Sequence, residues 1–164
     1  MSTTYPSATV DVPERLSVRR LQPEAYRALL QLERATAEAG LEPSLRELIK
    51  LRASQINGCA YCIDMHTKDA RAAGETEQRL YMLGAWREAP LYTARERAAL
   101  AFTEAVTLVA DGHVPDSAYE AVAVAFDERE ISALIMAIAV INAWNRVAIS
   151  SRTHAGDFQA RSRS

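Results

Sequence analysis

The chain has 164 residues, which is enough for one domain with its own core. Hydrophobic residues make up 49% of it and the formal net charge is −2, as in ordinary globular proteins. This balance excludes a strongly basic surface, so we expect no nucleic-acid partner. Residues 1–11 lack the basic start and apolar run of a secretory signal. We therefore expect a cytoplasmic protein with no membrane partner.

Helix-forming residues dominate after residue 20, and glycine and proline fall between the periodic segments. The sequence predicts seven helices, over residues 23–39, 43–56, 59–73, 76–86, 93–110, 115–125 and 127–149. No segment shows the pattern of a strand, so the predicted fold class is all-α, a helical bundle. We expect a loosely ordered N-terminal arm (1–20), one all-helical domain (21–155) and a C-terminal tail (156–164).

The last predicted helix is apolar on nearly all sides. Asn142, Asn145 and Arg146 interrupt it, and the apolar run before Asn142 is too short to span a bilayer. A helix without a polar face is buried all round. Two arrangements remain open for it, the centre of one monomer or an interface between subunits.

Two cysteines, Cys59 and Cys62, are the only ones in the chain, and they lie three positions apart. A disulfide that closes so short a loop contributes little to stability. The pair therefore indicates redox chemistry or metal binding. Asn57-Gly58 is a helix stop, which places Cys59 at the start of the next helix. Free amides and the helix dipole favour a thiolate there.

A histidine and a glutamate join the cysteines in the predicted site. Helical spacing puts Cys59, Cys62 and His66 on one face of a helix. The imidazole can take or return a proton as the thiols cycle. If the two helices around residues 57–58 form a hairpin, Glu47 and His66 lie level, because each is about three turns from the connection. We predict a catalytic set of Cys59, Cys62, His66 and Glu47, with no bound cofactor or metal.

Other interpretations use the same residues. Zinc could take four ligands from Cys59, Cys62, His66 and Glu47, although zinc-ribbon cysteines normally sit on turns. Two cysteines on an apolar face could also be ordinary core residues. A thioredoxin fold places its cysteine pair after a strand, which is not predicted here. A metal-binding or redox-sensing module without turnover is thus the alternative to an enzyme.

The segment Leu45–His66 resembles the core of AhpD-like alkylhydroperoxidases, which belong to the carboxymuconolactone decarboxylase superfamily. Residues 141–146 resemble them as well. The resemblance implies an all-helical fold assembled as a homo-oligomer, a trimer or hexamer. It also implies reduction of hydroperoxides, or of a partner's disulfide, with an external dithiol or protein as reductant. The active site that it implies is Cys59, Cys62, His66 and Glu47.

Tyr61 departs from the family pattern, because the best-studied members carry a second histidine at that position. A phenol titrates near 10 and cannot relay protons at neutral pH as imidazole does. Thiol–disulfide exchange needs less machinery than strong peroxidase turnover. The family mechanism favours Cys62 as the attacking thiol and Cys59 as the resolving thiol. The decarboxylase branch does not rely on the cysteine pair, which makes a lyase a further alternative.

The sequence leaves the surroundings of four residues open. Arg52 falls within the apolar arc of its helix, so its guanidinium requires a carboxylate or carbonyl partner. Asn142, Trp144 and Asn145 have two open placements, near the thiols or at an interface.

Overall fold

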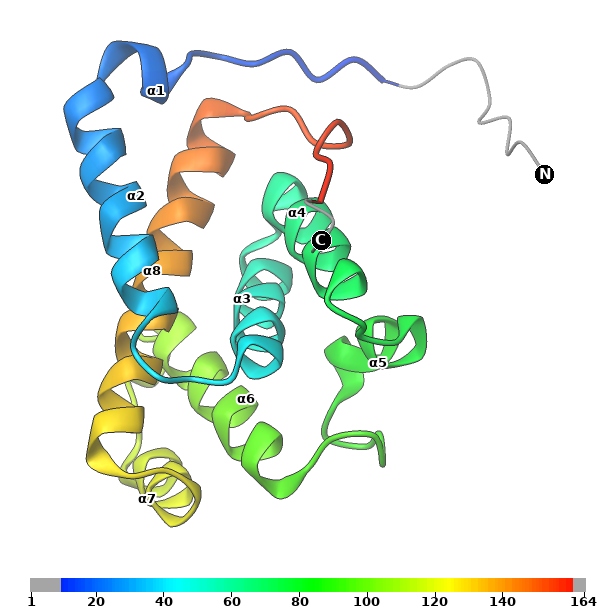
Figure 1. The fold of residues 1–164 in the computed structure, drawn as a ribbon, viewed down its shortest axis with the longest axis vertical. Helices are drawn as coiled ribbons and strands as arrows, with labels where there is room; N and C mark the ends of the chain where they lie inside the picture. Colours follow the sequence, from blue (N-terminus) through cyan, green and yellow to red (C-terminus); the bar gives the residue numbers. More distant parts are fainter. Residues whose placement is uncertain (1–9, 161–164) are drawn as a thin grey trace.

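The computed structural model describes residues 10–160, and every regular element in that range is helical (Figure 1). In chain order the elements are α1 (Val18–Leu21), α2 (Pro23–Ala37), α3 (Pro43–Asn57), α4 (Ala60–Ala72), α5 (Glu77–Met82), a 3₁₀ turn (Leu83–Ala85), α6 (Ala94–Thr107), α7 (Asp116–Ala125) and α8 (Glu128–Ser151). The predicted all-α fold class is therefore confirmed.

Local signals in the sequence explain where the long helices begin. Thr93 and Glu96 form a capping box at the start of α6, and Asp127 with Glu130 forms another at the start of α8. In each box the two side chains satisfy amides that have no partner within the helix. Proline occupies the first turn of both α2 and α3, where its missing N–H costs no hydrogen bond.

Two predicted helices differ from the observed elements. The helix expected to reach Ala110 ends at Thr107, and the Asp111 amide then donates to the Leu108 carbonyl at 2.7 Å. This turn takes the place of a further turn of α-helix. The helix expected over 76–86 is divided into α5 and the 3₁₀ turn, with Gly84 inside that turn. A glycine lowers the stability of an α-helix interior by about 1 kcal/mol relative to alanine.

Helix α3 lies in the middle of the bundle and packs against α4, α6 and α8, whereas α2 lies along α8 (Figure 1). One buried cluster joins α3, α6 and α8 through residues that include Ile49, Phe102 and Ile138. A second cluster joins α3 to the region of α5 and contains Trp86. The central position of α3 means that most of its side chains from Leu45 to Ser54 are buried against neighbouring helices.

Helix α8 is only partly enclosed by its own chain. By length and composition alone it is the one described helix that could cross a membrane, a test that buried core helices also pass. Half of its most apolar window is buried inside the bundle. Ile135, Met136 and Ile149 are each more than 40% exposed. The expectation of burial on all sides is therefore wrong within a single chain.

The carboxylate partner that Arg52 requires is Glu104. Arg52 Nε donates to Glu104 Oε1 at 2.8 Å, and Trp86 Nε1 donates to the same oxygen at 2.8 Å. Burial would raise the pKa of the Glu104 carboxyl, but these donors, with Arg87, hold it below its ordinary value. The guanidinium is thus paired within the chain, as its position in an apolar arc requires.

Asparagine side chains fasten the end of α3 to α8. Asn57 Nδ2 donates to Asn142 Oδ1 at 2.9 Å and to Asn145 Oδ1 at 2.8 Å. Asn145 Nδ2 in turn donates to Ser54 Oγ at 3.0 Å, and Asn145 is fully buried. Buried polar networks of this kind fix one arrangement of the elements that they join. Here they hold the residues directly before Cys59.

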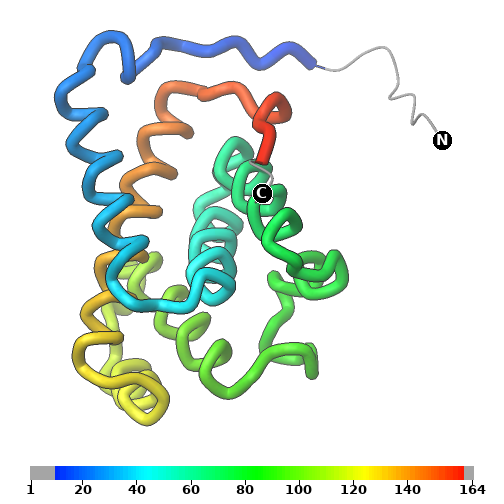
Figure 2. Tube along the Cα trace, in the orientation of Figure 1, coloured from blue at the N-terminus to red at the C-terminus, as the bar shows by residue number. Residues whose placement is uncertain are grey.

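The ends of the described chain run across the bundle (Figure 2). Residues 10–17 form no helix, and the Arg15 amide donates to the Ser151 carbonyl at the end of α8. The last part of the predicted arm, 18–20, belongs to α1, and residues 1–9 lie outside the described range. In the predicted tail, Gly156 and Phe158 carbonyls accept from Lys68 Nζ of α4 at 2.9 Å.

We predict that Asn145→Ala lowers the free energy of unfolding by about 2–3 kcal/mol, because it removes the hydrogen bonds that this buried side chain makes with Ser54 and Asn57. Chemical denaturation measures this change. The control Ser150→Ala replaces an exposed residue of the same helix and should change the value by no more than about 0.5 kcal/mol. Equal stabilities of the two variants would contradict the role given to the network.

Candidate active site

The site is built on the connection between α3 and α4. Helix α3 ends at Gly58, whose φ of 69° and ψ of 33° lie in the left-handed region that glycine adopts without strain. The Cys59 amide donates back to the Ser54 carbonyl at 3.0 Å. The chain therefore reverses within two residues, and α3 and α4 pack side by side. This is the hairpin that the sequence predicts.

The cysteines lie at the start of α4. Cys59 is the N-cap residue, and its sulfur accepts a hydrogen bond from the Cys62 amide at 3.3 Å. The two cysteines form a disulfide with their Cα atoms 5.4 Å apart, within the ordinary range. Both residues are 99% buried. The two sulfurs are therefore bonded to each other at the start of α4.

Glu47 and His66 are in contact, as predicted from their similar distances along α3 and α4 from the connection between these helices. His66 Nδ1 lies 2.8 Å from Glu47 Oε2, and the histidine side chain is almost fully buried. Burial by itself would raise the pKa of the Glu47 carboxyl, but the hydrogen bond and charge of His66, with Lys50 and Arg46, hold it below its ordinary value. Glu47 is therefore a carboxylate at neutral pH.

This contact fixes the role of each ring nitrogen of His66. A carboxylate only accepts hydrogen bonds, so Nδ1 must donate to Glu47. In the neutral ring the proton-accepting nitrogen is then Nε2. Nε2 is buried and has no hydrogen-bond partner among residues 10–160. The geometry thus leaves Nε2 as the ring nitrogen that no residue of the described range engages.

Asp69 is a site residue that the sequence analysis missed. Ligand atoms of Glu47, His66 and Asp69 lie within 4.8 Å of one another. Burial raises the pKa of the Asp69 carboxyl, and the charge of Glu47 raises it further. Its spacing of three residues from His66 puts it on the same face of α4, which is the signal that could have identified it. This group of three ligand residues differs from the four zinc ligands considered from the sequence. Cys59 and Cys62 are not part of it, because their sulfurs are bonded to each other.

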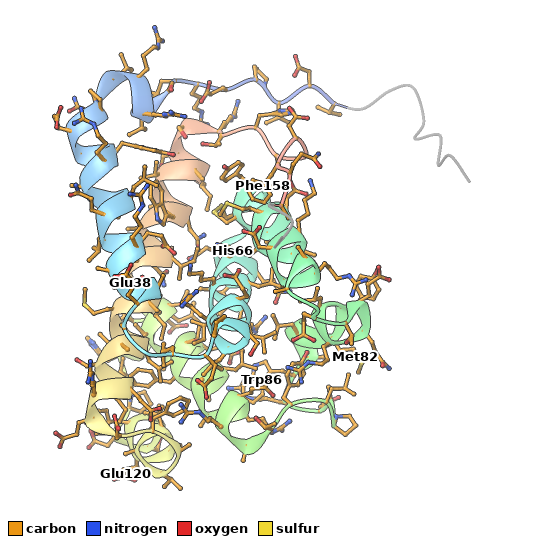
Figure 3. The ribbon with its side chains drawn as sticks, in the orientation of Figure 1. Glu38, His66, Met82, Trp86, Glu120 and Phe158 are labelled. Atoms are coloured by element: carbon orange, nitrogen blue, oxygen red, sulfur yellow. A yellow bond between two sulfur atoms is a disulfide. The ribbon has the colours of Figure 1, made fainter. Side chains whose placement is uncertain are left out.

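Cys62, His66 and Asp69 line one cavity of about 310 Å³. Figure 3 shows His66 well inside the outline of the bundle, near α3 and α4. The cavity has a carboxylate and imidazole region on α3 and α4 and an aromatic region contributed by three helices. Its full lining is Tyr26, Leu30, Glu33, Glu47, Lys50, Tyr61, Cys62, Met65, His66, Asp69, Trp144, Val147, Ala148 and Thr153.

Cys59 lines a different cavity, of about 650 Å³. Its walls come from residues 10–12, the start of α4 and residues 152–155. Tyr61, Ala148 and Thr153 border both cavities and separate them. The two residues of one disulfide therefore line different cavities.

Tyr61 borders the cysteines as a neutral phenol. Burial raises the pKa of Tyr61, and Tyr26, Asp64 and Asp69 raise it further. Its ordinary value is already near 10. The expectation that this residue does not exchange protons at neutral pH in the manner of imidazole is therefore supported by its surroundings.

Solved structures identify the fold as AhpD-like. ATU0492 from Agrobacterium tumefaciens, a protein of unknown function and candidate antioxidant defence protein AhpD, is 42% identical, with a TM-score of 0.86 over 89% of this chain and 100% of that one. The AhpD core of a peroxidase-related protein from Ralstonia eutropha JMP134 is 22% identical, with a TM-score of 0.75 over 85% and 75% of the two chains. At 19% identity and a TM-score of 0.76, the debrominase Bmp8 shares the fold alone, over 84% and 74%.

Sequence comparisons agree with the fold. The model of the carboxymuconolactone decarboxylase family matches residues 23–105. The uncharacterized protein YdfG of Bacillus subtilis (strain 168) is 44% identical over 137 residues, which cover 84% of this chain and 93% of that protein. The chain therefore belongs to the carboxymuconolactone decarboxylase family, as an AhpD-like member.

We predict that Glu47→Gln lowers the free energy of unfolding at pH 7 by about 1 kcal/mol, because a charge-assisted hydrogen bond becomes a neutral one. The folded-state pKa of Glu47 is lowered, so its contribution is present above the unfolded value near 4.3 and is lost as pH falls through the folded value. Denaturation at pH 7 and at pH 3.5 should show the difference from wild type shrinking in acid.

The matched control for this measurement is Glu88→Gln, which replaces an exposed carboxylate. It should leave the pH dependence of unfolding unchanged. A constant difference between wild type and Glu47→Gln at both pH values would contradict the assignment of Glu47 as the carboxylate partner of His66.

Proposed function

We propose that this protein is a thiol-dependent peroxidase or disulfide reductase that works through a Cys59–Cys62 dithiol cycle. The observation that carries the proposal is one cavity in which the Cys62 sulfur, held next to its disulfide partner, shares its walls with the Glu47–His66 pair. Membership of an AhpD-like family, with peroxidase-related proteins of the same fold, supports it.

The proposed oxidation begins at Cys62. His66 Nε2 takes the thiol proton, and the thiolate attacks the terminal oxygen of a hydroperoxide. The O–O bond breaks, Cys62 becomes a sulfenic acid, and His66 returns the proton to the departing alkoxide to give the alcohol. The Cys59 thiol then attacks the Cys62 sulfur, which forms the disulfide and releases water. An external dithiol or protein thiol returns the pair to its reduced form by exchange.

The two cysteines have different surroundings that match these roles. Cys62 lies one turn before His66 on α4 and lines the same cavity, so it is the sulfur beside the base. Cys59 is the N-cap, where the Cys62 amide and the helix dipole stabilise a thiolate. A stabilised thiolate is a good leaving group when a reductant opens the disulfide. We therefore propose Cys62 as the attacking thiol and Cys59 as the resolving thiol.

Exposed apolar side chains support a homo-oligomer, a trimer or hexamer as proposed from the family. Val124 at the end of α7 is 90% exposed, and Ile135 and Met136 of α8 are also exposed. These side chains belong to α7 and α8, two helices that pack against each other. Large exposed apolar areas commonly mark contacts between subunits.

The test is a thiol count on reduced protein before and after one equivalent of tert-butyl hydroperoxide. We expect two free thiols to fall to none, with a Cys59–Cys62 disulfide found by peptide mass spectrometry. His66→Gln should slow this oxidation about a hundredfold or more, since it removes the base. The control His113→Gln replaces an exposed histidine and should leave the rate unchanged.

Three results would count against this proposal. If both thiols persist with peroxide and with a disulfide substrate, the dithiol cycle is wrong. Stoichiometric zinc held by the two thiols of protein purified without chelator would favour the metal-binding alternative. Lyase activity on a lactone acid that survives loss of both cysteines would favour the decarboxylase branch.

A further inference from the structure

The aromatic region of the Cys62 cavity is the feature that the dithiol chemistry leaves unexplained. Three rings from three separate helices face this space, Tyr26 of α2, Tyr61 of α4 and Trp144 of α8. Tyr26 and Trp144 meet edge to face, with ring centroids 5.1 Å apart and planes at 71°. All three residues are only partly buried, so ring surface remains open to the cavity.

We infer that this cavity binds a neutral hydroperoxide with a single aromatic ring, a substrate class that rests on the peroxidase form of the proposed function. Ring-to-ring contacts are directional and add to ordinary apolar burial. Leu30, Met65 and Val147 complete an apolar surround. The substrate's ring lies among the three aromatic side chains, and its peroxide group lies toward Cys62 and His66.

The size of the cavity limits the substrate further. A volume of about 310 Å³ lies at the lower end of the range for small-molecule sites, about 300–1,000 Å³. This space suits one ring with a short branch better than a long acyl chain. Long-chain lipid hydroperoxides are therefore disfavoured on size.

The charges of the lining select against anions. Three carboxyl groups, those of Glu33, Glu47 and Asp69, line the cavity with one ammonium group, that of Lys50. Lys50 is paired with Glu33, and Glu47 is hydrogen-bonded to His66. Among the described residues of this wall no uncommitted cation remains for a substrate carboxylate, and a buried unpaired charge is costly. The substrate is therefore neutral.

The test measures the rates at which four oxidants consume the thiols of the reduced full-length protein. The oxidants are cumene hydroperoxide, tert-butyl hydroperoxide, hydrogen peroxide and linoleic acid hydroperoxide. We expect cumene hydroperoxide to react about three- to tenfold faster than tert-butyl hydroperoxide, from its ring contacts. Linoleic acid hydroperoxide should react more slowly than cumene hydroperoxide, because it is long and anionic.

Substitutions of the aromatic residues test whether the preference for cumene hydroperoxide arises in this cavity. Trp144→Leu and Tyr26→Leu should each reduce the ratio of the cumene to the tert-butyl rate about threefold or more, and the ratio is independent of how much protein is active. Two positions on different helices guard against one variant failing to fold. The control Tyr81→Leu replaces a tyrosine that is 76% exposed on α5 and should keep the wild-type ratio.

The possible outcomes separate this inference from the proposed function. Equal rates with cumene and tert-butyl hydroperoxide would overturn the aromatic preference while the dithiol cycle stands, as would unchanged ratios in both ring variants. If no oxidant consumes the thiols, the proposed peroxidase function fails and the inference falls with it. A second measurement needs no turnover: the disulfide form should bind 2-phenyl-2-propanol more tightly than tert-butanol, and equal binding would contradict the inference.

Discussion

The reversal of the chain at Gly58 places every chemical group of the site. A left-handed residue here lets α3 end and α4 begin within two residues, so the cysteines lie at a helix start rather than inside one. The same reversal brings Glu47 level with His66 at a distance of 2.8 Å. Hydrogen bonds from Asn57 to the asparagines of α8 fix the position of this turn relative to α8. The relative positions of the cysteine pair, His66 and Glu47 thus all depend on the turn at Gly58.

Much of the fold and of the candidate site could be predicted from the sequence, because both depend on residue spacing along single helices and on one hairpin. The all-α fold, the start of α4 at the cysteines and the Glu47–His66 contact all follow from local rules. The aromatic region could not be predicted, since Tyr26 and Trp144 meet only when α2 packs along α8. Asp69 was missed because its carboxyl matters through the proximity of Glu47, a group on another helix. The end of α6 at Thr107 depended on a competing turn.

The two cavities give the disulfide an asymmetry that suits a catalytic cycle. Cys62 faces the cavity with the base and the aromatic rings, and Cys59 faces the one formed with residues 10–12 and 152–155. In the proposed cycle the substrate and the reductant both react at Cys62, and Cys59 is the leaving group when the disulfide is opened. Tyr61 lines both cavities and contributes ring surface to each. In the proposed cycle proton transfer on the Cys62 side rests on His66, with Glu47 fixing its tautomer and Asp69 close to both.

The central claim is that Cys62 is the sulfur that a peroxide oxidises first. Chemical trapping tests it most directly, because dimedone captures a sulfenic acid that has no neighbouring thiol to condense with. The Cys59→Ser and Cys62→Ser proteins are each treated with one equivalent of hydroperoxide and dimedone, and adducts are located by peptide mass spectrometry. The account predicts an adduct on Cys62 in Cys59→Ser and little or none on Cys59 in Cys62→Ser. The reverse pattern, an adduct on Cys59 and none on Cys62, would contradict it.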